Sequence, residues 1–190
     1  MPYAQPMQTL RALCLICGLL APAGSVLADQ KDPRLDGLFA SLKDVPGPGA
    51  AVAVERQIWA IWLETGEEDV AALLEAGIAD MGRGRFAQAL KAFDRVVEAA
   101  PGFAECWNKR ATLYYFMGDY KRSLEDIART LELEPRHFGA LSGRGLVYIR
   151  LDDFESALKA FEDALAVHPQ MPGPKANAEA IRKVLKEREI

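Results

Sequence analysis

The chain has 190 residues, of which 50% are hydrophobic and 26% are charged, and its formal net charge at pH 7 is −4. This length and composition suit one ordinary globular domain, with or without appendages. The acidic balance, with no evident basic face, argues against nucleic acid as a partner, because phosphate contacts require clustered lysine and arginine.

Residues 1–28 are predicted to form a secretory signal peptide. Arg11 is the only charged residue before Asp29, and it precedes the apolar run ALCLICGLLAPAG. Because Val26 and Ala28 are small or aliphatic, cleavage is expected after Ala28. The run is shorter than the roughly 20 residues that span a bilayer. We therefore expect an exported protein with no membrane span after cleavage; retention of the segment as an anchor is the alternative.

Cleavage would leave Cys106 as the only cysteine, because Cys14 and Cys17 precede Ala28. The remaining chain could form no internal disulfide. A nucleophilic thiol needs a neighbouring base and an electropositive setting. Cys106 instead stands beside Trp107 in a helical pattern, so we expect a semi-buried packing residue.

Residues 29–69 are predicted to form a pair of leader helices separated by the break PGPG at 46–49. The first helix has an apolar stripe at helical spacing, Leu35, Leu38, Phe39 and Leu42. The second, AAVAVERQIWAIWLETG, has the inward residues Val54, Ile58, Ile61 and Trp62.

From residue 70 to residue 171 the sequence matches itself at a spacing of 34 residues. Three sets of equivalent residues illustrate the period: Pro101, Pro135 and Pro169; Gly77, Ala111 and Gly145; Phe93, Ile127 and Phe161. A fixed period of this kind is the signature of a repeat array. The predicted repeats are 70–103, 104–137 and 138–171.

Each repeat is predicted to be a helical hairpin. In the middle repeat Trp107, Ala111 and Tyr114 fall on one helical stripe. The small Ala111, like the equivalent glycines, would let a second helix approach closely. Gly118 would end the first helix, because glycine adopts the left-handed conformation without strain. A hairpin of this kind buries its stripe only by stacking on a neighbour.

The middle repeat reads W-x-x-x-A-x-x-Y-x-x-x-G-D-Y-x-x-S-x-x-x-I-x-x-x-L-x-x-x-P from Trp107 to Pro135, which resembles the tetratricopeptide repeat. Three copies in phase cover more than half of the chain. The resemblance implies an all-α solenoid of helical hairpins, wound as a right-handed superhelix, that binds another molecule.

The repeats depart from the family pattern in two ways. Ala76, Arg110 and Arg144 replace the leucine that often precedes the small residue, and Asp80 replaces a tyrosine in the first repeat. The two arginines could bind an anion. We expect instead that both form ion pairs with Asp126, on the helix that would lie between them.

Both ends of the array are predicted to be covered. The leader, with D-P-R-L-D-x-L-F followed by I-W-x-x-W, resembles that of small exported tetratricopeptide proteins of Gram-negative bacteria, which implies a periplasmic location. Residues 172–190 are predicted to form a C-terminal capping helix with a solvated outer face. Its expected inner stripe is Ala176, Ala180, Ile181, Val184 and Leu185.

The resemblance places the first helices of the repeats along a concave surface. Its expected residues are Leu74, Ile78, Met81, Glu105, Asn108, Thr112, Tyr115, Phe116, Ser142, Leu146, Ile149 and Arg150. An apolar, aromatic surface with a few polar groups suits a bound peptide or helix. Tyr115 and Phe116 would supply affinity, and Asn108 and Arg150 orientation. The alternative is that the leader folds back and Trp59 or Trp62 fills the groove.

One subclass of the family grips a C-terminal carboxylate with a clamp of lysine, asparagine and arginine. The matching positions here are Leu74, Ile78, Lys109, Gly139 and Gly143. Only Lys109 could serve, so this mode of binding is not expected.

The sequence shows no catalytic or metal-binding pattern. The two histidines, His137 and His168, fall in loops near prolines, and no Cys/His cluster has metal-ligand spacing. We predict no catalytic residue, no cofactor and no metal. The predicted function is that of an exported scaffold that binds a protein or peptide partner. The alternatives are a self-associating structural subunit and an enzyme with an unrecognised site.

Overall fold

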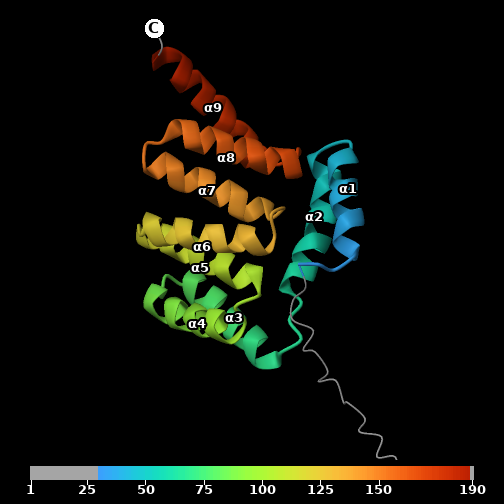
Figure 1. The fold of residues 1–190 in the computed structure, drawn as a ribbon, viewed down its shortest axis with the longest axis vertical. Coiled ribbons are helices and arrows are strands. Elements are labelled where there is room, and N and C mark those ends of the chain that lie inside the picture. The colour runs from blue at the N-terminus through green and yellow to red at the C-terminus, as the bar shows by residue number, and fades with distance from the viewer. Residues whose placement is uncertain (1–29, 189–190) are drawn as a thin grey trace, which may run out of the picture.

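The computed structural model describes residues 30–188, and over these residues it contains nine α-helices and no strand (Figure 1). The predicted signal peptide lies outside the described residues. The helices are Arg34–Asp44 (α1), Pro48–Leu63 (α2), Glu68–Gly82 (α3), Phe86–Ala99 (α4), Ala104–Met117 (α5), Tyr120–Leu133 (α6), Phe138–Arg150 (α7), Phe154–Val167 (α8) and Pro172–Arg188 (α9).

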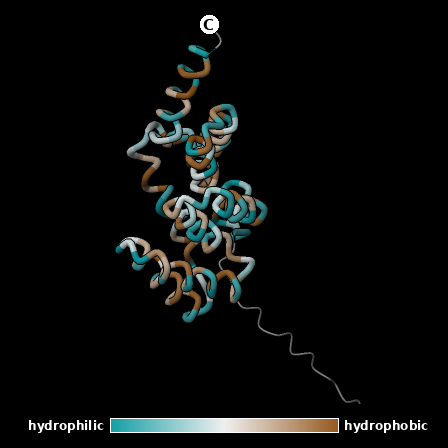
Figure 2. The backbone as a smooth tube through the Cα atoms, turned by 90° about the vertical axis from the view of Figure 1, so that its left-hand side faces the viewer, coloured by the Kyte–Doolittle hydropathy of each residue, from teal (hydrophilic) through white to brown (hydrophobic). Residues whose placement is uncertain are grey.

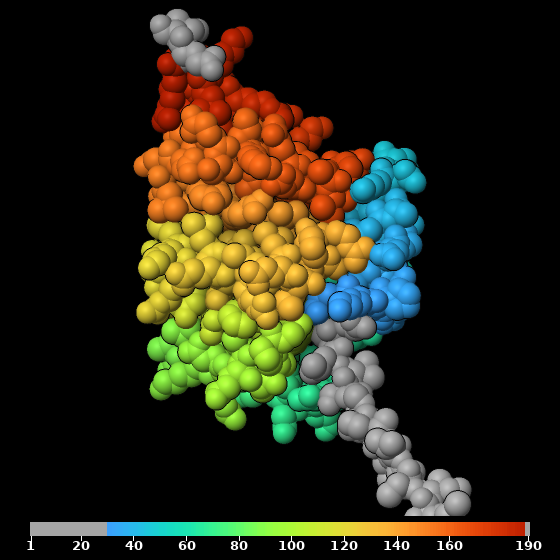
Figure 3. Space-filling model, in the orientation of Figure 1, coloured from blue at the N-terminus to red at the C-terminus, as the bar shows by residue number. Residues whose placement is uncertain are grey.

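The helices form a stack of three hairpins, α3–α4, α5–α6 and α7–α8, with α9 packed on α8 (Figure 1). Successive hairpins appear as consecutive bands in Figure 3, with α1 and α2 along one side. Apolar and polar residues interleave along the helices, as amphipathic helices require (Figure 2). The predicted fold class, an all-α solenoid of helical hairpins with a leader pair and a C-terminal helix, is confirmed.

The outer hairpins depend on a close approach between a glycine and a phenylalanine. A Cβ atom added at Gly77 would lie 2.5 Å from Cε1 of Phe93, and one at Gly145 would lie 2.6 Å from Cε1 of Phe161. Both rings are fully buried. Any side chain at either glycine would therefore force the ring or the helices to move, which confirms the predicted close approach at Gly77 and Gly145.

Two of the three stripe residues predicted for α5 are buried. Ala111 and Tyr114 lie in the interior, whereas Trp107 is half-buried and its Nε1 donates a hydrogen bond to the carbonyl of Pro101 at 3.0 Å. Gly118 ends α5 with φ 77°, in the left-handed region, as predicted. Asp119 then caps α6, because its side chain accepts a hydrogen bond from the backbone of Arg122.

The inner face of α9 differs from the prediction. Ala178 and Ile181 are buried, with Pro174 one turn before them and Leu185 half-buried after them. Ala176 and Ala180, which were expected inside, are exposed. The predicted inner face is wrong in the first half of the helix. Ala176, Ala178 and Ala180 point in different directions there, so the sequence does not show which of them belongs to the apolar stripe.

The leader helices pack across the side of the stack rather than onto its end. The predicted inward residues Leu35, Leu42, Ile58 and Trp62 are fully or almost fully buried. They form one cluster with Phe138 at the start of α7, and Val167 and Met171 lie against it. The leader therefore joins the α6–α7 and α8–α9 connections, which lie along one side of the array.

A buried polar pair anchors this contact. His137 stacks on Trp62 with ring centroids 4.2 Å apart and an interplanar angle of 7°. Its Nδ1 accepts a hydrogen bond from the backbone N–H of Ala140 at 3.0 Å. The ring proton therefore sits on Nε2, which donates to Oε2 of Glu105 at 2.9 Å. One imidazole thus caps α7, supports the leader and partners a buried carboxylate.

Glu105 is fully buried, and its charge is compensated by its neighbours. Lys109 Nζ lies 2.7 Å from Oε1, and Asn108 Nδ2 donates to Oε2 at 2.9 Å. Burial raises the pKa of Glu105, but the hydrogen bond from His137 and the charge of Lys109 lower it more, so the net shift is downward. The carboxylate is therefore held ionised inside the protein.

The second histidine predicts a pH-dependent stability. His168 is 2% exposed, and its Nε2 lies 3.5 Å from Oε2 of Glu55 on α2. Burial lowers the pKa of His168 below its ordinary value of 6.5, and Glu55 restores it only in part. Since the folded state then binds the proton less readily than the unfolded state, stability is complete above about pH 6.5 and decreases as the pH falls.

We expect the melting temperature to fall on going from pH 7 to pH 5.5, and to fall less in His168→Gln. Thermal unfolding at a series of pH values measures both proteins. If the melting temperatures of the two proteins fall equally with pH, the assignment of this acid sensitivity to His168 is contradicted.

Candidate binding groove

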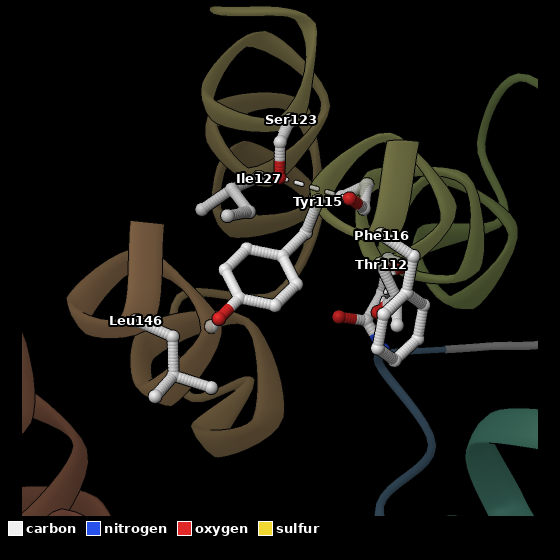
Figure 4. A pocket seen from close by; sticks show the side chains of 9 residues that line it. Thr112, Tyr115, Phe116, Ser123, Ile127 and Leu146 are labelled. Atoms are coloured by element: carbon white, nitrogen blue, oxygen red, sulfur yellow. Dashed lines mark hydrogen bonds between the residues drawn. The ribbon is translucent and has the colours of Figure 1, made fainter. Parts of the chain in front are cut away.

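An apolar pocket opens between α5, α6 and α7 (Figure 4). Its volume is about 200 Å³. The residues that line it are Asn108, Ala111, Thr112, Tyr115 and Phe116 of α5, Ser123 and Ile127 of α6, and Gly143 and Leu146 of α7. None of these lining residues is charged, so the pocket suits an apolar group.

The pocket arises from one packing pair. In the outer hairpins a phenylalanine ring lies against the glycine at this position, but the middle hairpin has Ala111 and Ile127 instead. Isoleucine is shorter than phenylalanine, so less of the space beside α5 is filled. Gly143 adds no side chain from α7; a Cβ there would lie 3.9 Å from Cδ1 of Ile127. The middle hairpin is therefore hollow where the outer ones are filled.

Aromatic side chains form the rim of the pocket. Phe116 is 57% exposed and stacks on Phe86 of α4, with centroids 6.4 Å apart and an interplanar angle of 12°. Tyr115 is half-buried, with its centroid 5.8 Å from that of Phe116 and 6.0 Å from that of Tyr120. Figure 4 shows the Tyr115 ring extending from α5 toward Leu146 of α7. Three successive helices are thus bridged by rings.

Arg150 stands beside this rim, at the end of α7. Its Nε donates a hydrogen bond to the hydroxyl of Tyr115 at 3.2 Å, and its guanidinium carbon lies 5.7 Å from the centre of that ring. Arg150 is exposed, and no carboxylate among residues 30–188 forms an ion pair with it.

Half of the predicted groove residues lie at the pocket or its rim. Asn108, Thr112, Tyr115, Phe116 and Leu146 line it, and Arg150 contacts Tyr115. These residues come from the middle hairpin and from the first helix of the third.

The other predicted groove residues are placed elsewhere. Leu74 and Glu105 are buried, so including them in an open surface was wrong. Ile78 and Met81 pack on the core of the first hairpin. Ile149 packs toward α8 and α9, and Ser142 is half-buried outside the pocket lining.

Sequence reasoning missed four lining residues, Ala111, Ser123, Ile127 and Gly143. A signal for two of them was present, because Ala111 and Ile127 replace the Gly–Phe pair of the other repeats. Reading paired positions across the repeats, rather than each position alone, would have indicated a space in the middle hairpin.

The leader covers the groove at one end but does not enter the pocket. Lys109 Nζ lies 5.2 Å from the ring centre of Trp59, and a Cβ at Gly139 would lie 3.0 Å from Cη2 of the same indole. Trp59 thus covers two of the positions that match the carboxylate clamp. A leader tryptophan was expected to fill the groove. Trp59 does cover the groove near the starts of α5 and α7, but no leader residue lines the pocket.

The two repeat arginines are both paired, but only one as predicted. Arg110 binds both oxygens of Asp126, at 2.7 and 2.8 Å, and also Asp94 at 2.8 Å. Arg144 pairs with Asp163 of its own hairpin at 2.8 Å, so the predicted pair with Asp126 is wrong. Both oxygens of Asp126 are occupied by Arg110, and Asp163 lies within reach on α8. Each arginine is thus paired with a carboxylate of the protein.

The described residues show little sign of other chemistry. Cys106 is fully buried, and burial raises the pKa of its thiol to about 12, so it is a packing residue rather than a nucleophile. Within residues 30–188 no three His, Cys, Asp or Glu side chains are grouped so that they could hold a metal ion. Of the helices in the same range, none has the length and hydropathy to cross a membrane.

The family pattern of the tetratricopeptide repeat matches residues 50–104, 74–115 and 108–172. This chain belongs to the tetratricopeptide repeat family. A TPR repeat-containing protein of Rhizobium etli is 36% identical to it over 136 residues, which cover 72% of this chain and 67% of that protein. The Hsp70-Hsp90 organizing protein of Triticum aestivum is 30% identical over 107 residues, 56% of this chain but only 18% of that protein.

Solved structures share the fold at low sequence identity. The Sgt2 TPR domain from Aspergillus fumigatus is 21% identical, with a TM-score of 0.61 over 65% of this chain and 83% of that chain. The first TPR domain of Spaghetti, solved with an HSP90 peptide, is also 21% identical, with a TM-score of 0.60 over 63% and 94% of the two chains.

The origin of the pocket can be tested by restoring the outer-hairpin pair. We expect Ile127→Phe alone to destabilise the protein by about 1–3 kcal/mol, because its ring would press on the Cβ of Ala111. Adding Ala111→Gly should relieve that contact, although glycine in a helix costs about 1 kcal/mol. Urea unfolding of the wild type, the two single variants and the double variant gives the coupling free energy between the two positions. We expect the double variant to be more stable, by about 1 kcal/mol or more, than the sum of the two single effects predicts. Strictly additive effects would contradict the proposed packing pair.

Proposed function

We propose that this protein is a non-catalytic scaffold that binds a protein or peptide partner at the pocket between α5, α6 and α7. The pocket supports this proposal because it is open and its lining is uncharged, with Phe116 and Leu146 exposed at its rim. Exposed apolar surface around a concave site is typical of interaction sites.

Similarity to peptide-binding domains supports the proposal. The first TPR domain of Spaghetti was solved bound to an HSP90 peptide, and the second TPR domain of human RPAP3 was solved in complex with an HSP70 peptide. The mode of binding proposed here differs from a carboxylate clamp. Of the five matching positions, Leu74 is buried and Trp59 covers Lys109 and Gly139. The pocket, rather than a clamp, would hold the partner.

Self-association through the same surface is the second candidate. Met117 and Leu151, which follow the pocket residues along α5 and α7, are apolar and 44% and 48% exposed. A second copy of the chain could cover these side chains across a two-fold axis.

We also propose that the protein is exported to the periplasm and loses residues 1–28. Support comes from the apolar run after Arg11 and the small residues before Asp29. The mass of the protein recovered from the cell envelope tests this: a chain beginning at Asp29 is expected, and a chain that retains Met1 would contradict it.

The binding proposal is tested by affinity capture from envelope extract with three forms of the protein. The wild type and Val52→Ala, which changes an exposed apolar residue of α2 that does not line the pocket, are expected to retain the same partner. The Ala111→Gly/Ile127→Phe variant, whose pocket is filled, is expected to lose it. Identical captures from all three would contradict binding in the pocket. Capture of the protein's own copies alone, with a doubled mass in solution, would favour self-association.

A further inference from the structure

We propose that the bound segment carries one large apolar side chain, which fills the pocket, and next to it an aspartate or glutamate, whose carboxylate pairs with Arg150. This inference rests on the proposed binding function and names the class of partner: an acidic segment with an aromatic or branched aliphatic anchor.

The size of the pocket limits the anchor to one side chain. A cavity of about 150 Å³ lined by apolar side chains is large enough to hold benzene. The volume here is about 200 Å³, which suits one aromatic or branched aliphatic residue. Ala111, Ile127 and Leu146 form apolar walls, and a charged side chain placed among them would lose its hydration without gaining a partner.

Arg150 supplies the charge because it is exposed and uncommitted. A guanidinium carries five N–H donors, and only Nε is used, toward the hydroxyl of Tyr115. No acceptor for its terminal amino groups is found among the described residues. Arg110, Arg136 and Arg144 differ, because each is paired with a carboxylate.

The contact with Tyr115 places this charge at the mouth of the pocket. Tyr115 lines the pocket, and the guanidinium of Arg150 lies over its ring. Holding the arginine in this way reduces the conformational entropy lost when a carboxylate binds. A carboxylate beside the inserted side chain could therefore accept from the free amino groups.

Lys109, a second cation near the groove, cannot take this role. Lys109 pairs with the buried Glu105 at 2.7 Å and is covered by Trp59. The leader also closes the groove on that side, at the starts of α5 and α7. The acidic residue of the partner must therefore point toward the end of α7.

A basic residue in the last turn of a helix also stabilises the helix dipole. That role alone would make Arg150 matter for melting temperature but not for the sequence of a bound peptide. Peptide preference therefore separates the two roles.

The test is a selection from a random linear peptide library, displayed so that the peptide C-terminus is blocked by fusion. The baits are wild type, Arg150→Glu and the pocket-filled Ala111→Gly/Ile127→Phe variant. Peptides enriched on wild type should share one aromatic or branched aliphatic residue with an aspartate or glutamate within a few positions. On Arg150→Glu the acidic position should change to lysine or arginine.

An enriched peptide is then synthesised with blocked ends, and its affinity is measured by fluorescence polarisation. We expect Arg150→Glu to weaken binding by about fivefold and Arg150→Lys to weaken it less. The melting temperatures of both variants serve as the control for folding.

The outcomes distinguish this inference from the proposed function. If the enriched peptides share an apolar anchor without an acidic residue, and Arg150→Glu selects the same peptides, the role of Arg150 is overturned while binding in the pocket stands. If wild type enriches no peptide, or the pocket-filled variant enriches the same ones, the proposed function fails and this inference fails with it.

Discussion

Close packing between the two helices of a hairpin sets the geometry of the whole array. In the outer hairpins a phenylalanine ring lies against Gly77 or Gly145, where even a Cβ atom would be too near. These contacts bring the helices together so that hairpins can stack side by side. In the middle hairpin the corresponding residues are Ala111 and Ile127, and the isoleucine side chain fills less of the space between the helices than a phenylalanine ring does. A single pair of substitutions within a repeat thus produces a pocket without changing the fold.

The leader determines how much of the groove is available. Trp62 stacks on His137, which also caps α7 and donates to the buried Glu105. Removing the side chain of His137 or of Glu105 would leave the polar group of the other without its partner in the interior. The leader is therefore part of the folded array rather than a loose extension. It covers Lys109 and Gly139, in the first halves of α5 and α7, and leaves Phe116 and Arg150, near the ends of these helices, exposed.

Much of the fold could be predicted because its signals are local and repeated. The 34-residue period, the small residue at Ala111 and the glycine at Gly118 each specify one contact or one turn. The small residue recurs as Gly77 and Gly145, whereas the glycine recurs as Gly84 in the first repeat and is replaced in the third by Asp152, which adopts the left-handed conformation itself. The position of the leader could not be predicted. The apolar stripe around Trp62 shows that this face is buried, but nothing in it indicates packing against His137, 75 residues away. Glu105 was misplaced for the same reason, because its partner lies in another connection. The pocket depends on differences in volume between repeats, which a pattern of residue types conceals.

A pocket open in the middle hairpin should accept an apolar group of side-chain size, and this can be measured directly. Benzene titrated into protein with ¹³C-labelled isoleucine and leucine methyl groups provides it, with chemical shifts as the readout. We expect saturable shifts at Ile127 and Leu146, which line the pocket, and little change at Ile58 and Ile181, which are buried elsewhere. Shifts of equal size at all four residues, or none at Ile127, would contradict the existence of an open pocket in the middle hairpin.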